Sequence, residues 1–141
     1  MSVEWGPASD GLRLGLAADG PVAVLHLQNT GAEALDVLSH VLAGGGIQLD
    51  WFTVHVGAHD VTFVDDRDRS TPVTAHLQPG EALRHTVDVA AWAARTTGAL
   101  PPGAHSTTAT YLVESAPDVW CGRLDAGPVT LTVAAPAPEE A

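Results

Sequence analysis

Between residues 51 and 89, apolar and polar residues alternate with the period of two that half-buried β-strands require, and this pattern constrains the fold more than any other feature. In the segment WFTVHV, the side chains of Phe52, Val54 and Val56 fall on one side of an extended strand. A β-branched and aromatic run follows at 60–64, after the turn residues Gly-Ala-His-Asp. Residues 51–64 therefore predict a β-hairpin whose loop is slightly longer than two residues.

Two further strands are predicted in the same stretch. The segments VTAHL and ALRHTVDV are separated by Gln-Pro-Gly-Glu, in which proline and glycine stand where a tight turn favours them. In the second segment His85 falls on the apolar side with Leu83 and Val87, and the other side is polar. Four consecutive strands joined by turns predict the core of an antiparallel all-β domain.

The rest of the chain continues this pattern. We predict strands at 12–17, 22–28, 34–43, 106–113 and 128–133, one helical turn near Val89, and a loop at 114–127. Eight or nine short strands indicate an immunoglobulin-like antiparallel β-sandwich, with closure into a barrel as the structural alternative. We expect a loose lead-in at 1–10, a single sandwich domain at 11–134 and a disordered tail at 135–141.

The charge of the chain argues against several classes of partner. Seventeen acidic and six basic residues give a formal net charge of −11, and such a surface repels phosphate groups. We therefore expect no binding to nucleic acid and no docking on anionic membranes. Cys121 is the single cysteine, so no intrachain disulfide is expected, and the sequence contains no secretory signal and no membrane-spanning run. These features predict a cytoplasmic protein.

Several short motifs occur in an order that resembles a known family. The stretch LHLQNTGAEALDVL is followed by the hairpin F-T-V-H-V-G-x-x-x-V-T-F, then by H-L-Q-P-G-E and T-V-D-V. Over residues 22–113 this order resembles the non-catalytic β-sandwich domain that precedes the zinc domain in the deuterolysin-like (aspzincin) peptidyl-lysine metalloendopeptidases. The His-Glu-x-x-His helix of that family's protease domain does not occur here. The resemblance therefore implies an accessory module rather than a protease.

Seven histidines suggest a metal site, and the sharpest candidates flank the predicted hairpin turn. His55, His59 and Asp60 combine imidazole with carboxylate, which suits zinc or copper. No known ligand spacing is matched, so the alternative is that His55 lies on an outer sheet face and His59 in a solvated turn.

The acidic loop after the hairpin is a second candidate site. Asp65, Asp66 and Asp68 could offer oxygen ligands to calcium or magnesium. The loop lacks the glycine and the spaced glutamate of a calcium loop, so the alternative is a solvated loop with partial internal ion pairing. The three aspartates are also a candidate interface with a partner.

Two tryptophans and the cysteine are the remaining candidates. Trp51 and Trp92 would mark an interface if they are exposed, because tryptophan is enriched at binding hot spots. Cys121 would need a neighbouring base to act as a nucleophile, and the alternative is that it packs beside Trp120. The sequence contains no Gly-x-Ser-x-Gly elbow, and we predict no catalytic residue and no cofactor.

Three functions follow from these patterns. The leading hypothesis is a non-catalytic binding or accessory module, inhibitor-like or chaperone-like, that contacts a protein partner as a monomer or homodimer. The first alternative is a small enzyme or small-molecule binder of bacterial specialised metabolism, with His, Asp and Trp in its pocket. The second alternative is a metal-binding β-sandwich.

Overall fold

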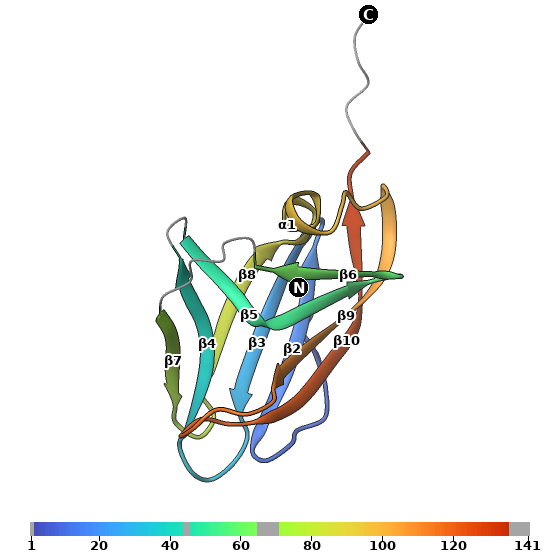
Figure 1. Ribbon diagram of the computed structural model, residues 1–141. Coiled ribbons are helices and arrows are strands. Elements are labelled where there is room, and N and C mark those ends of the chain that lie inside the picture. Colours follow the sequence, from blue (N-terminus) through green and yellow to red (C-terminus); the bar gives the residue numbers. More distant parts are fainter. Residues whose placement is uncertain (1, 44–45, 65–70, 136–141) are drawn as a thin grey trace, which may run out of the picture.

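The computed structural model describes residues 2–43, 46–64 and 71–135, and within these ranges the chain forms two packed antiparallel sheets and one helix (Figure 1). One sheet has the strand order β1-β2-β3-β8, and the larger sheet has the order β10-β9-β5-β4-β7, with β6 paired to β5. The elements are β1 (Glu4–Trp5), β2 (Leu12–Asp19), β3 (Val22–Asn29), β4 (Leu35–Ala43), β5 (Gly46–Val56), β6 (His59–Phe63), β7 (Thr71–Leu77), β8 (Ala82–Asp88), α1 (Val89–Thr96), β9 (Gly103–Val113) and β10 (Gly122–Val133).

This arrangement confirms the predicted all-β antiparallel sandwich, while the assignment to the immunoglobulin-like class stays a prediction. The core lies between the sheets, where the apolar positions of the alternating pattern meet. It is formed by Leu12, Leu14, Leu16, Leu25 and Leu27 from one sheet and by Phe52, Val54, Tyr111 and Leu131 from the other. Each of these large side chains contributes about 1.5–3 kcal/mol by its burial. No helix in the described ranges is long and apolar enough to cross a membrane.

The hairpin of β5 and β6 is tighter than predicted. Val56 pairs directly with His59, so Gly57 and Ala58 alone form the turn. Gly57 has a φ of 58°, and glycine at the first central position is what a type II′ turn requires. The prediction of a longer loop was wrong because it placed His59 in the turn, whereas His59 is the first residue of β6.

The four consecutive strands of residues 51–89 are divided between the two sheets. β7 pairs with β4 and β8 pairs with β3, so the turn between them carries the chain from one sheet to the other. Buried Asn29 holds this turn, because its side-chain amide donates to the backbone carbonyl of Leu77 and its backbone carbonyl accepts from the backbone N–H of Gly80. A contact made by a distant residue therefore decides the path that the local pattern left open.

The two ends of the domain also differ from the prediction. The expected lead-in at 1–10 contains β1, in which Trp5 pairs with Gly15 of β2. The predicted loop at 114–127 is shorter, because β10 begins at Gly122. A bulge between Ala126 and Val129 interrupts the alternation, and this hid the first half of the strand. The tail is described as far as Ala135, and 136–141 lie outside the described residues.

The predicted helical turn is a helix of eight residues at one end of the sandwich, beside β6 (Figure 1). Asp88 caps its N-terminus by accepting a 3.0 Å hydrogen bond from the backbone N–H of Ala91. Val89 and Ala93 are buried, and Trp92 packs edge-on against Phe63. The spacing of these three residues thus places one face of the helix on the core.

The larger sheet opens between β4 and β5. β4 and β5 pair where Val41 lies opposite Gln48 and Leu42 lies opposite Ile47. Farther along β5, residues Phe52 to Val56 pair with β9 instead. Over Val37 and Leu38, β4 pairs with β7 and not with β5. The candidate binding groove lies where these two strands diverge.

Candidate binding groove

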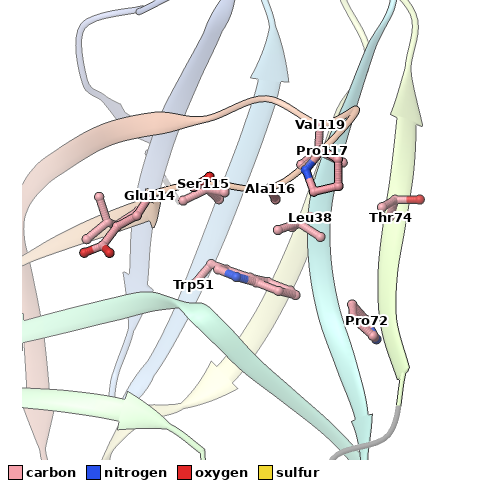
Figure 2. Close-up of a pocket in the computed structure, with 11 residues that line it drawn as sticks. Leu38, Trp51, Pro72, Thr74, Glu114, Ser115, Ala116, Pro117 and Val119 are labelled. Atoms are coloured by element: carbon pink, nitrogen blue, oxygen red, sulfur yellow. The ribbon is translucent and has the colours of Figure 1, made fainter.

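A groove of about 640 Å³ lies over this opening, beside the connection between β9 and β10. Its walls are mostly apolar and include Leu38, Trp51, Pro72, Leu112, Pro117 and Val119. Figure 2 shows the indole of Trp51 lying across the groove, with Glu114 and Ser115 toward one end and Pro72 and Thr74 toward the other. Trp51 is half-buried, and Glu114 and Leu112 are exposed, so a ligand can reach the groove from solvent.

Hydrogen bonds hold the walls of the groove in place. The connection at 114–121 is tied to β4 by the backbone N–H of Trp120, which donates a 2.8 Å bond to the carbonyl of Asp36. The indole N–H of Trp120 donates to the carbonyl of Ser9 at 3.1 Å. The thiol of Cys121 donates a 3.4 Å hydrogen bond to the carbonyl of Ala116. The half-buried cysteine therefore shapes the loop, and none of its hydrogen-bond partners is a base.

The predicted metal ligands are partly brought together. His55 Nδ1 lies 2.7 Å from a carboxylate oxygen of Asp60, because the two residues pair directly across β5 and β6. His59 is adjacent to Asp60 in β6, and strand alternation directs its side chain to the opposite face. In the part of the chain that the structure describes, no group of three or more His, Cys, Asp or Glu could hold a metal. Asp65, Asp66 and Asp68 lie outside the described residues.

The His55 pair extends into a row of hydrogen bonds across four strands. His55 Nε2 lies 2.9 Å from the Thr110 hydroxyl, which donates a 2.8 Å bond to Asp125. Carboxylate, imidazole and hydroxyl occur here in the order of a catalytic relay. Because the Thr110 hydrogen is directed to a second carboxylate and Thr110 is 8% exposed, this hydroxyl is not offered to a substrate. The row instead links β6, β5, β9 and β10.

A second histidine cluster lies between the sheets. The Ser39 hydroxyl is 3.0 Å from His40 Nδ1 and 3.0 Å from His85 Nε2. Burial lowers the pKa of His85 and the neighbouring His40 lowers it further, while a hydrogen bond with Ser39 opposes them. His85 borders a cavity of about 170 Å³ that Trp92 also lines.

Among the two predicted interface tryptophans, the structure places Trp51 in the groove and Trp92 elsewhere. Trp92 lies on α1, between the ring of Phe63 and the guanidinium of Arg95. Sequence reasoning missed the rest of the groove, namely Leu38, Pro72, Glu114 and the 115–119 segment. These residues come from three separate segments, and no local sequence pattern connects them.

In comparisons with protein-family models, with curated proteins and with solved structures, nothing matches this chain. The resemblance to the accessory domain of the aspzincin peptidases therefore stays a prediction.

Proposed function

We propose that this chain is a non-catalytic binding module that holds an extended segment of a partner protein in the Trp51 groove. The observation that carries the proposal is a half-buried tryptophan that lines an apolar groove open to solvent. Aromatic anchors in pockets of this kind supply much of the binding energy at protein interfaces. The resemblance to an accessory domain points to the same class of function.

An edge strand beside the groove favours an extended partner. β7 is the last strand of the larger sheet among the described residues, and Pro72 and Thr74 of this strand line the groove. A segment that pairs with the outer side of β7 gains backbone hydrogen bonds, and its alternate side chains face the groove. Pro72 lacks a backbone donor, so pairing is expected nearer to Thr74.

The alternative of a small enzyme or ligand binder requires an enclosed pocket with converging histidines. The Trp51 groove is open, and none of the described residues that line it is a histidine. The cavity beside His85 has a volume of about 170 Å³. Ordinary small-molecule sites are larger, with volumes of about 300–1,000 Å³. The geometry therefore favours the partner hypothesis.

The test is selection of a displayed library of random 12-residue peptides on the purified protein, with excess soluble Trp51→Leu variant as competitor. Peptides that bind the groove survive this competition, because the variant lacks the indole. Trp5→Leu provides the matched control, since Trp5 is half-buried on the smaller sheet. The proposal fails if no selected peptide distinguishes the native protein from a Trp51→Leu variant that unfolds at the same temperature.

A further inference from the structure

Two of the three half-buried tryptophans are covered by an arginine of the chain itself. The guanidinium carbon of Arg13 lies 4.0 Å from the centre of the Trp5 ring, and that of Arg95 lies 4.1 Å from the centre of the Trp92 ring. Planar guanidinium groups stack on indole rings through cation–π attraction and dispersion. Trp5 and Trp92 thus share one arrangement, in which an arginine of the chain stacks on a half-buried indole ring.

Trp51 is the third half-buried tryptophan, and no arginine of the described ranges lies over its ring. Its ring lies in the groove, at an opening where a side chain from outside can reach it. The fourth tryptophan, Trp120, is buried against Tyr111 and offers no such surface.

The groove also has a negative wall. Glu114 lines it and is exposed, and none of the described residues forms an ion pair with its carboxylate. Arg123 pairs with Leu112 across β9 and β10, and its guanidinium already binds Asp125. The chain as a whole carries a formal charge of −11. An incoming cation is therefore favoured both near the groove and at longer range.

We propose that the Trp51 groove binds an arginine side chain of the partner segment, with the guanidinium stacked on Trp51 and paired with Glu114. This inference rests on the proposed function and specifies the side chain that the groove accepts. Arginine suits the groove better than lysine does, because its flat and weakly hydrated head can lie on an indole while it donates to a carboxylate. Its methylene stem would cover the apolar wall at Leu38 and Pro72.

The experiment uses four capped peptides, Thr-Val-X-Val-Thr, in which X is arginine, lysine, citrulline or leucine. Each is titrated into the full-length ¹⁵N-labelled protein, and the shift of the Trp51 indole N–H resonance is followed. The resonance is assigned by its loss in Trp51→Phe, and the indoles of Trp5, Trp92 and Trp120 serve as internal controls. Citrulline has the shape of arginine without its charge, so it isolates the cation.

We expect the arginine peptide to bind about tenfold more tightly than the citrulline or leucine peptide, and more tightly than the lysine peptide. Glu114→Gln should reduce the preference for arginine over citrulline about threefold or more. Glu4→Gln, at an exposed carboxylate in β1 of the smaller sheet, should leave it unchanged. Equal or tighter binding of the leucine peptide would overturn the arginine assignment and leave the groove as a binding site. If no peptide moves the Trp51 resonance, both the arginine assignment and the proposed function are wrong.

Discussion

The hydroxyl of Tyr111 in β9 donates a 2.7 Å hydrogen bond to the backbone carbonyl of Leu38 in β4, across the opening where β5 leaves β4. This bond joins two strands that are not neighbours in the sheet. Both groups are buried, and burial raises the pKa of Tyr111, so the phenol remains a donor. The side chain thus replaces the missing backbone ladder beneath the groove.

Replacing Tyr111 with phenylalanine should therefore lower the stability of the domain. The variant keeps the ring but leaves the buried carbonyl of Leu38 without its donor, which costs about 1–3 kcal/mol. Urea unfolding followed by tryptophan fluorescence measures the change. Thr62→Val, at an exposed position of β6, should change the free energy of unfolding by less than about 0.5 kcal/mol. A Tyr111→Phe variant as stable as the native protein would show that the bond does not contribute.

Stability should fall as the pH is lowered below 6.5, because the pKa of His85 is lowered by burial and by His40 from the ordinary value of 6.5. In the unfolded chain His85 takes up a proton as the pH passes 6.5, whereas in the folded domain it does so at lower pH. The unfolded state therefore binds more protons in this window, and acidification favours unfolding. The stability is fully present above pH 6.5 and decreases toward the native pKa.

Free energies of unfolding measured from pH 8 to pH 5 test this expectation. His85→Gln should flatten part of the pH dependence, and His59→Gln provides the control because His59 is exposed. His26 is expected to add a slope of the same sign, since partial burial, followed by the charge of Arg84, lowers its pKa. A slope that is unchanged in His85→Gln would contradict the assignment.

The row of hydrogen bonds through Thr110 should control the pKa of Asp125. Burial alone would raise this pKa, but hydrogen bonds from Arg123 and Thr110 and nearby positive charge hold it below its ordinary value of 3.8. Thr110→Val removes one of these donors, so the pKa of Asp125 should rise. Titration of the carboxyl carbon by NMR measures the shift, and Thr108→Val in the same strand is the matched control. An unchanged titration curve would mean that the Thr110 hydroxyl does not bond Asp125 in solution.

The tight turn between β5 and β6 should depend on Gly57. An added Cβ would meet nothing within 4 Å, so any cost of Gly57→Ala arises from the backbone at φ of 58°. We expect a loss of about 1 kcal/mol, measured by urea unfolding. Ala58→Ser, at the other turn position, should be nearly neutral. A neutral Gly57→Ala would indicate that the turn relaxes to another type.

The sequence was sufficient to predict strands wherever one face is buried. Leu12, Leu14 and Leu16 alternate in the sequence and are fully buried in β2. The alternation is a local property, because it follows from the two-residue repeat of the extended backbone. Where a bulge interrupts the repeat, as between Ala126 and Val129, the first half of the strand was missed.

Of the residues that line the candidate groove, Trp51 is the one that the sequence predicted. Trp51 stands out because tryptophan is rare and the alternation places it away from the core. Its neighbours in the groove, such as Pro72 and Glu114, have no local pattern that connects them with Trp51.

The sequence by itself determined the fold class, the main strands and the acidic charge, since each depends on neighbouring residues or on composition. The tertiary structure decided which strands share a sheet, and therefore where the sheet opens. The turn at Gln78–Glu81 could have joined β7 and β8 as a hairpin, yet its contact with Asn29 sends them to different sheets. Strand pairing depends on contacts between residues far apart in the chain, which a local pattern cannot specify. The groove exists because of that long-range choice.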